Sequence, residues 1–432
     1  MSLNSLNNNY RYLKIKEILE DFAKRFSDPY QSLKFFKGID VSERYFDLAN
    51  GPIGMVIVFN EISKILDSNK HIEIAHSYLS FCNNQIKSDS MLSFYSPWSG
   101  YGAFAALTQI LPKKYYSKFS AQLDNVIFNK ERFEKFIEHK NLQIYNKNLK
   151  ISDYDLLQGI SGFIRYLCIR DDYNKIKWYI EECVLYLMKI MDISNNGIPN
   201  CFVPYNNQPN ILKKIYPKGH INIGLSHGIS GILATFSILY IRNKEFEYLS
   251  NKIKEIANLI ISFSQKTQFG IVWPKHITLE EYKSGSAAKT VNNESWCYGE
   301  IGIARSIFLA SRALNDSKME AMSIECFRNV CDRRIGDWRI KSTTFCHGIS
   351  GLFYLVFQMY LDTGLKVFLD YSDYLIDIIL DSYENKEKYN MFLDEREYPG
   401  ILDGEGGIIL ALTSYINDQM ERNKWDWLFL IN

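Results

Sequence analysis

The sequence lacks the features that would place a chain in a membrane or on a nucleic acid. No stretch approaches the about 18 to 20 apolar residues that a membrane-spanning helix needs. Residues 1–10 are polar and have no apolar core of a secretory signal. The 50 basic and 49 acidic side chains give a formal net charge of +1, so no overall field attracts nucleic acid. These absences predict a cytoplasmic protein without a nucleic-acid partner.

The sequence also lacks any Cys-x-x-Cys pair, although it contains eight cysteines. In a cytoplasmic protein these cysteines should stay reduced. Cys201 lies in a loop and has no obvious partner. Five others occur in segments with helical patterning, where we expect core residues or partly buried thiols: Cys82, Cys168, Cys183, Cys326 and Cys331. The remaining two, Cys297 and Cys346, each stand shortly before a glycine.

These two cysteines and one histidine form a candidate set of three metal ligands. Cys297 lies in the motif Ser-Trp-Cys-Tyr-Gly, and 49 positions later Cys346 is followed directly by His347 and a glycine. Thiolate sulfur and imidazole nitrogen are donors that zinc prefers, and three protein ligands leave one position open, as in catalytic zinc sites. Isolated cysteines are also common as small buried hydrophobes. The spacing alone leaves both interpretations open.

A weak repeat runs through the whole chain. Its unit is a small-residue pair of the form Gly-x-x-Gly, followed by an almost wholly apolar run. Seven copies begin at Gly51, Ser99, Gly159, Gly228, Gly299, Gly348 and Gly404. The copies are 48 to 71 residues apart, a period that indicates a repeat architecture. Because glycine allows close approach of backbones, we expect these turns to gather at one end of the fold.

Each repeat unit predicts two helices. Residues 231–242 are apolar on nearly every side, which indicates a buried helix. Residues 251–262 carry apolar side chains at helical spacing with charges between them, which indicates a surface helix. The same pair recurs at 352–360 and 367–380. Buried and amphipathic helices in alternation predict an all-α fold, an α/α toroid of seven inner and seven outer helices.

We expect this toroid to form one domain over residues 1–432. Residues 195–222 and 268–295 are predicted to be long irregular loops. Residues 112–150 carry nine basic and four acidic side chains, which suits either a small inserted subdomain or a solvated basic face.

Three motifs together resemble the lanthionine synthetase C-like family, and most closely the free-standing cyclases of class I lanthipeptide biosynthesis. The motifs are Trp-Cys-Tyr-Gly at 296–299, Cys-His-Gly at 346–348 and Gly-Leu-Ser-His-Gly-Ile-Ser-Gly at 224–231. The likeness spans about residues 45–415. It implies the α/α toroid, and one zinc ion per chain held by Cys297, Cys346 and His347. It also implies functional roles for Asp155 and His227.

The resemblance implies a zinc-dependent lanthipeptide cyclase. In this reaction a peptide cysteine thiol adds to dehydroalanine or dehydrobutyrine and forms a lanthionine or methyllanthionine thioether ring. We expect metal coordination to provide the thiolate and His227 to supply the proton that the α-carbon needs. Asp155 is expected to orient His227 or to take the thiol proton. Tyr298 is either a hydrogen-bonding partner of the sulfur or the enolate, or a packed aromatic residue.

The substrate implied by the resemblance is a dehydrated precursor peptide with its leader. The resemblance also allows a complex with a dehydratase and a peptide exporter, through which the protein would associate with the membrane. Two other functions remain open. One is a prenyltransferase-like thiol-alkylating subunit, whose zinc site usually includes a carboxylate. The other is a non-catalytic toroid that binds peptide thiols or glutathione.

The chain departs from the family's pattern at Asn293. Family members commonly have an arginine four residues before the first zinc cysteine, whereas asparagine brings no charge. The cationic role of that position is therefore absent here or taken by another side chain, for which Lys289 and Arg305 are the candidates.

Overall fold

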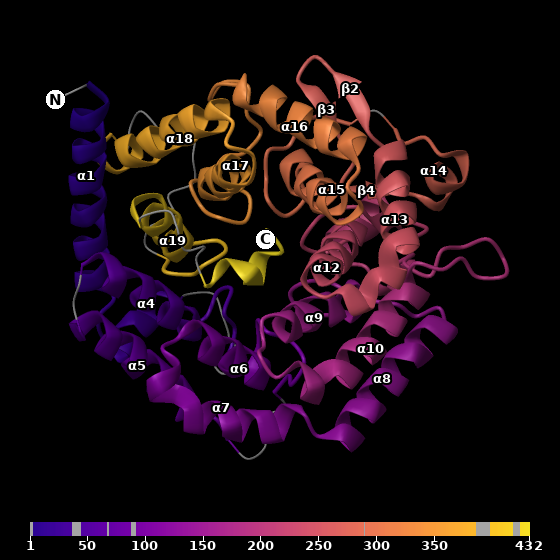
Figure 1. The fold of residues 1–432 in the computed structure, drawn as a ribbon, viewed down its shortest axis with the longest axis horizontal. Coiled ribbons are helices and arrows are strands. Elements are labelled where there is room, and N and C mark those ends of the chain that lie inside the picture. The colour runs from indigo at the N-terminus through magenta and orange to yellow at the C-terminus, as the bar shows by residue number, and fades with distance from the viewer. Residues whose placement is uncertain are drawn as a thin grey trace. The chain divides into compact units, whose positions relative to one another are not determined.

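The computed structural model describes residues 3–36, 45–66, 69–87, 92–288, 290–385, 398–417 and 424–432. The chain divides into two compact units, both built mainly from helices (Figure 1). Unit 1 comprises residues 1–93, 98–117 and 340–425, and unit 2 comprises residues 94–97, 118–339 and 426–432. Within the described ranges, no helix combines the length and the apolar character needed to cross a bilayer.

Unit 1 is a two-layer arrangement of helices. The buried helix α19 packs against both α4 and α17, while α5 covers α4 and α18 covers α17. Helix α1 packs on α4, α18 and α19. The helices of this unit are α1 (Leu3–Arg25), α2 (Pro29–Ser32), α4 (Met55–Ile65), α5 (Asn69–Asn83), α6 (Gly100–Ile110), α17 (Ile349–Thr363), α18 (Lys366–Glu384) and α19 (Glu405–Ile416), with the short 3₁₀ helices Leu33–Phe35 and Pro52–Gly54.

Unit 2 follows the same plan. Helix α12 packs between α9 and α15, and α10, α13 and α16 cover these three. The helices are α8 (Lys130–Tyr145), α9 (Ile160–Cys168), α10 (Tyr173–Ile190), α11 (Asn210–Ile215), α12 (Ile229–Arg242), α13 (Ser250–Ser262), α14 (Leu279–Ser284), α15 (Glu300–Leu314) and α16 (Ser317–Cys331); α7 (Lys113–Ile127) begins in unit 1 and ends in unit 2. Short 3₁₀ helices cover Ile151–Asp153, Tyr205–Asn207, Lys244–Leu249 and Asp426–Phe429.

Two short antiparallel strand pairs lie in the long loops of unit 2. Strand β1 (Ile221–Asn222) pairs with β4 (His276–Ile277), and Asn222 stands opposite His276. Strand β2 (Gln265–Thr267) pairs with β3 (Gly270–Val272). The first pair joins the loop before α12 to the loop that leads toward α15. The expected irregular character of both loops is therefore confirmed, apart from these strands and the short helices.

The predicted helix pairs are confirmed. Helix α12 buries all its side chains up to Leu239, as the all-round apolar pattern predicts. Helix α13 instead buries a single stripe, formed by Ile253, Ile256, Ala257 and Ile260. Helices α17 and α18 repeat this contrast between a buried and an amphipathic helix.

The Gly-x-x-Gly pairs are explained by close backbone contacts in the turn before each buried helix. A Cβ atom on Gly302 would lie 2.1 Å from the carbonyl oxygen of Trp296, six residues earlier, and one on Gly407 would lie 2.1 Å from that of Ile401. The same clash with a carbonyl six residues earlier would occur at Gly54, Gly162 and Gly231. Any larger residue would force these turns open. The repeated glycines are therefore required by the close approach of the backbone carbonyl.

Serine hydroxyls fasten three of these turns in the same way. In each Gly-Ile-Ser-Gly motif the serine Oγ donates to the carbonyl seven residues earlier: Ser161 to Tyr154, Ser230 to Ile223 and Ser350 to Thr343. These three hydroxyls are fully buried, so each bond satisfies two polar groups that water cannot reach. The turns therefore present the residues just before each buried helix on a fixed backbone.

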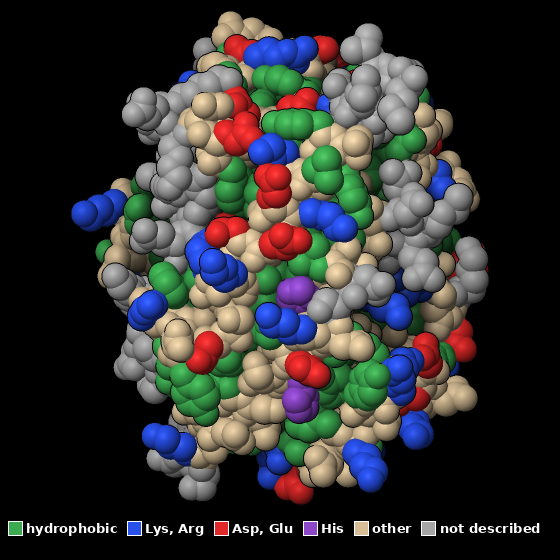
Figure 2. Space-filling view, turned by 90° about the vertical axis from the view of Figure 1, so that its left-hand side faces the viewer, with side chains coloured by type: hydrophobic (Ala, Val, Ile, Leu, Met, Phe, Trp, Pro, Cys, Tyr) green, Lys and Arg blue, Asp and Glu red, His purple; other side chains and the backbone are tan. Residues whose placement is uncertain are grey.

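The prediction of one domain over residues 1–432 stays a prediction. The structure does show which elements the basic segment, residues 112–150, contains. Residues 113–145 form α7 and α8, and α8 packs on α10. On the face that Figure 2 shows, basic and acidic side chains are interspersed, in keeping with the net charge of +1. The five cysteines expected in helices do lie in α5, α9, α10 and α16, and burial raises the pKa of Cys183 and Cys326 well above the usual value.

Candidate functional site

Cys297 lies in the turn that precedes α15 in unit 2. Its side chain is buried, with 5% of the residue exposed, and its sulfur forms no disulfide. The backbone N–H of Ser226 donates to the Cys297 carbonyl at 3.3 Å, which joins this turn to the turn before α12. A Cβ on Gly224 would lie 2.7 Å from the same carbonyl. The two turns are therefore in direct backbone contact, and this brings His227 toward Cys297.

His227 and Asp155 form a hydrogen-bonded pair. The imidazole Nδ1 lies 2.6 Å from Asp155 Oδ2, and because a carboxylate only accepts, Nδ1 is the donor. The other carboxylate oxygen accepts the backbone N–H groups of Gln158 and Gly159, both at 2.8 Å. Asp155 is thus held by the turn before α9 while it holds His227. This geometry leaves Nε2 of His227 as the nitrogen that can exchange a proton.

The surroundings of His227 favour its protonated form. Burial opposes the charge, but the hydrogen bond and the negative charge of Asp155, together with the nearby Cys297, outweigh it and raise the pKa of His227 above 6.5. The side chain is still 28% exposed, so a bound molecule can reach it. A buried carboxylate–imidazolium pair with an open face is suited to proton donation near neutral pH.

Tyr298 lies beside this pair. Its ring centroid is 5.8 Å from that of His227 and 5.5 Å from that of His276. The side-chain amide of Asn222 lies 3.5 Å from the Tyr298 hydroxyl oxygen, at the limit of hydrogen-bonding distance. Tyr298, His227 and Cys297 therefore share one region of unit 2, although their positions in the sequence are up to 71 residues apart.

Two further histidines line this region, and the sequence did not assign them a role. The ring of His276 contacts that of Tyr298, and the ring centroids of His220 and His276 lie 4.6 Å apart. Burial lowers the pKa of His220 to about 4 and that of His276 to about 3. Both are therefore neutral near pH 7, whereas the pKa of His227 is raised. Their position in the two long loops was the only signal in the sequence.

A cavity of about 700 Å³ opens beside this region of unit 2. Its lining includes His276 and Asn293, with apolar walls from Ile215, Trp273 and Val291. Ile215 and Val291 are more than half exposed. The cavity therefore offers apolar surface next to the residues that carry the candidate chemistry.

The other two candidate ligands lie in unit 1, in the turn before α17. Cys346 is half-buried and forms no disulfide, and its N–H donates to the Leu402 carbonyl at 2.9 Å. His347 Nδ1 lies 3.6 Å from Asp403 Oδ1, a charge contact beyond hydrogen-bonding distance. Asp403 also comes within 3.4 Å of the Asn50 side-chain amide. Cys346 and His347 therefore lie side by side in one turn of unit 1, with Asp403 next to the imidazole.

Asn293 contributes mainly through its backbone. Its N–H donates to Glu300 Oε2 at 2.6 Å, its carbonyl accepts the Glu300 N–H at 3.0 Å, and its side-chain oxygen accepts the Ser295 N–H at 3.2 Å. Of the two candidate replacement cations, Lys289 lies outside the described residues. Arg305 is fully buried and its Nε donates to the Ile431 carbonyl at 2.6 Å, so it holds the C-terminal segment of unit 2.

Comparisons with known proteins identify the family and the fold. The family model for the lanthionine synthetase C-like protein matches residues 42–430. Nisin biosynthesis protein NisC of Lactococcus lactis subsp. lactis is 23% identical over 378 residues, which cover 85% of each chain. Among solved structures, nisin cyclase matches with a TM-score of 0.76 at 21% identity, over 96% of each chain.

The structural match confirms the predicted fold class, an α/α toroid. The family match covers nearly the whole chain and includes all three motifs from which the resemblance was drawn. The protein is therefore a member of the lanthionine synthetase C-like family.

Proposed function

We propose that the protein is a zinc-dependent lanthipeptide cyclase. Its family membership supports the enzyme class, a lanthionine synthetase, and its relatives NisC and nisin cyclase are named for nisin biosynthesis and cyclisation. The observation that carries the proposal is the 2.6 Å pair of Asp155 and His227, placed beside Cys297 and Tyr298. A protein that only binds thiols has no need of such a proton donor.

We further propose that Cys297, Cys346 and His347 hold one zinc ion per chain. Two thiols outside any disulfide and one imidazole are the donor types that zinc prefers. The carboxylate of Asp403 beside His347 Nδ1 is the kind of partner that fixes a ligand histidine. Bound there, zinc would lower the pKa of a substrate thiol and so supply the thiolate near neutral pH.

The protein's own residues would handle the proton. When the thiolate sulfur bonds to the β-carbon of the dehydro residue, the electron pair of the double bond moves toward the carbonyl oxygen and gives an enolate. The α-carbon then takes one proton, which His227 donates from Nε2, and His227 recovers a proton from solvent or from the next thiol. Asp155 holds the imidazole through Nδ1 and stabilises its charged form. Under this proposal Tyr298 donates a hydrogen bond to the enolate oxygen.

The substrate under this proposal is a dehydrated, cysteine-containing precursor peptide with its leader. The reaction adds a thiol across a double bond, so product and substrate have the same mass. A complex with a dehydratase and a peptide exporter, a cytoplasmic location and an association with the membrane through that complex all stay predictions.

The experiment separates proton transfer from metal binding. Purified wild-type protein and the His227→Ala variant are assayed for bound zinc and for the rate of ring formation on a dehydrated precursor peptide, with an enzyme-free control. We expect the variant to keep about one zinc per chain and to cyclise about 10²- to 10⁴-fold more slowly. A variant that cyclises at the wild-type rate would remove His227 from the mechanism.

A further inference from the structure

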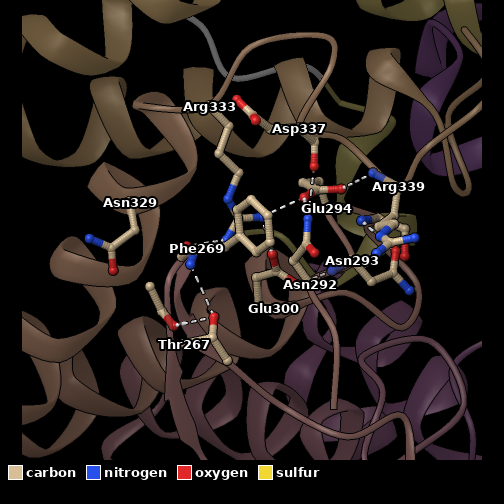
Figure 3. Close-up of polar contacts among 12 residues, drawn as sticks. Thr267, Phe269, Asn292, Asn293, Glu294, Glu300, Asn329, Arg333, Asp337 and Arg339 are labelled. Carbon is tan, nitrogen blue, oxygen red and sulfur yellow. Dashed lines mark hydrogen bonds and ion pairs between the residues drawn. The ribbon is translucent and has the colours of Figure 1, made fainter.

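One buried cluster of charged side chains binds both ends of the segment that contains Cys297. We call it the Arg333 cluster; it consists of Glu294, Glu300 and Arg333. Figure 3 shows the Arg333 side chain reaching toward both glutamates. Arg333 Nη1 lies 2.5 Å from Glu294 Oε1 and 2.5 Å from Glu300 Oε1, and the three side chains are at most 3% exposed.

Each carboxylate of the cluster also binds backbone or side-chain groups of its surroundings. The Glu300 carboxylate accepts the Asn293 N–H at 2.6 Å. Glu294 accepts the Asn292 side-chain amide at 2.6 Å and the Arg339 N–H at 2.9 Å. Residues 292–300 are therefore closed into a loop by side chains at positions 294 and 300. Cys297 and Tyr298 lie within this loop.

Arg333 is the group on which this closure depends. It lies beyond the C-terminal end of α16, and its Nη2 donates to the Phe269 carbonyl at 2.5 Å, so one guanidinium joins α16, the β2–β3 turn and the Cys297 loop. Without it, two buried glutamates would lack the cation that binds both, and an open loop in which water reaches them would be favoured.

We infer that Arg333 is a positioning residue for Cys297. Through Glu294 and Glu300 it holds residues 292–300 in the conformation that presents the Cys297 sulfur and the Tyr298 ring before any metal or peptide binds. This inference rests on the proposed function, in which Cys297 is a zinc ligand. It adds a residue outside all three sequence motifs to the parts that the site requires.

The chain offers a matched control in Arg170. Like Arg333, it binds two carboxylates, those of Asp124 and Asp172, each with a contact at 2.7 Å, and its side chain is 6% exposed. It follows the C-terminal end of α9 and contacts none of residues 292–300 through these bonds. An effect that Arg333→Met shows and Arg170→Met lacks is therefore specific to the Cys297 loop.

The test uses the full-length protein and two readouts. Zinc affinity is measured by competition with a chromophoric chelator, and backbone hydrogen exchange is followed in the metal-free protein. We expect Arg333→Met to weaken zinc binding at least tenfold and to speed exchange of the Asn293 and Glu300 amides at least tenfold. Arg170→Met should change both by less than twofold. Wild-type affinity and exchange in Arg333→Met would overturn the inference.

A conservative variant keeps the test decisive if Arg333→Met does not fold. Lysine at 333 keeps the charge, but a single ammonium cannot reproduce the forked contacts to two carboxylates and a carbonyl. Arg333→Lys should therefore show intermediate zinc affinity and intermediate exchange, and wild-type values for both would count against the positioning role. A wild-type protein that binds no zinc or forms no rings would instead contradict the proposed function. The two failures can be told apart, because hydrogen exchange in the metal-free protein tests the positioning role without zinc or ring formation.

Discussion

Glu300 and Glu405 occupy the same position in two repeats. Each is the first residue of a buried helix, α15 in unit 2 and α19 in unit 1, and each is at most 1% exposed. Each donates its N–H to the carbonyl seven residues earlier, Asn293 or Tyr398. Each carboxylate also meets an arginine, since Glu300 binds Arg333 and Glu405 binds Arg25 at 2.8 Å.

The two turns differ in what surrounds that arginine. Arg333 is buried and binds a second buried carboxylate, Glu294, whereas Arg25 is 32% exposed and its other acidic partner, Asp21, is 64% exposed. Burial, together with the charge of Glu294, raises the pKa of Glu300 to about 7 despite the opposing charge of Arg333. The glycines and one acid suffice to form the turn. The additional buried charges occur where the turn carries a candidate zinc ligand.

The largest expected effect is the loss of a zinc ligand, which we compare with the loss of a residue that only contacts a ligand. Cys297→Ala removes a sulfur donor from the turn before α15, and we expect it to lose most of the bound zinc and nearly all cyclisation. Asp403→Ala removes only the carboxylate beside His347 in the turn before α19, and should weaken zinc binding by about 10- to 100-fold. Elemental analysis and chelator competition measure both. Equal zinc content in Cys297→Ala and wild type would reject Cys297 as a ligand.

The next effect concerns stability. Arg333→Met should lower the free energy of unfolding by about 3–5 kcal/mol, because it leaves two buried carboxylates without their cation. Arg25→Met should cost less, about 1–2 kcal/mol, because its site is partly open to water and Tyr383 still donates to Glu405. Urea denaturation of the metal-free variants gives the comparison. A larger loss in Arg25→Met would show that the extra burial around Arg333 does not matter.

A third prediction uses the pKa of His227. If protonated His227 is the donor, the rate falls as pH rises through its raised pKa. Asp155→Asn removes the hydrogen bond to a charged acceptor and the negative charge. Burial then dominates and lowers the pKa of His227, although the smaller raising effect of Cys297 remains; His276 stays neutral near pH 7. The alkaline limb of kcat should therefore move to lower pH. If the alkaline limb of kcat does not move, the group that titrates there is not His227.

The smallest expected effect is at Asn293. Its backbone forms the two bonds to Glu300, and Asn293→Ala leaves both in place. The rate of cyclisation should therefore change by less than about tenfold, or 1.4 kcal/mol. Steady-state kinetics on the same precursor peptide measure this change. A collapse of activity would show that the side-chain amide has a role that its bond to Ser295 does not reveal.

The sequence predicted the fold because the relevant signals are periodic. The glycine pairs recur since the second glycine lies against a carbonyl six residues earlier in five of the seven copies, and the alternation of buried and amphipathic helices follows from side-chain burial. The Cys297, Cys346 and His347 motifs and the pairing of Asp155 with His227 were also accessible, through the resemblance. The structure adds the hydrogen bond that joins the last two.

The supporting residues were not accessible from the sequence. Glu294 and Glu300 are isolated charges, Arg333 stands between Asp332 and Arg334, and Arg333 is 39 residues from Glu294. Nothing local distinguishes a buried charge from an exposed one at such positions. His276 was given no role and Asp403 was missed, because their importance lies in contacts with Tyr298 and His347 that only the folded chain creates.

The central claim is that the protein forms thioether rings from peptide thiols. The most direct measurement counts free thiols, because ring formation leaves the mass unchanged. A dehydrated, cysteine-containing precursor peptide is incubated with the protein and then treated with a thiol-alkylating reagent, beside enzyme-free, chelator-treated and Cys346→Ala controls. The account predicts one fewer alkylation per ring with intact protein and full alkylation in the controls, after correction for the uncatalysed reaction. Thiols that stay free with folded, zinc-loaded protein would contradict it and would indicate a thiol-binding protein instead.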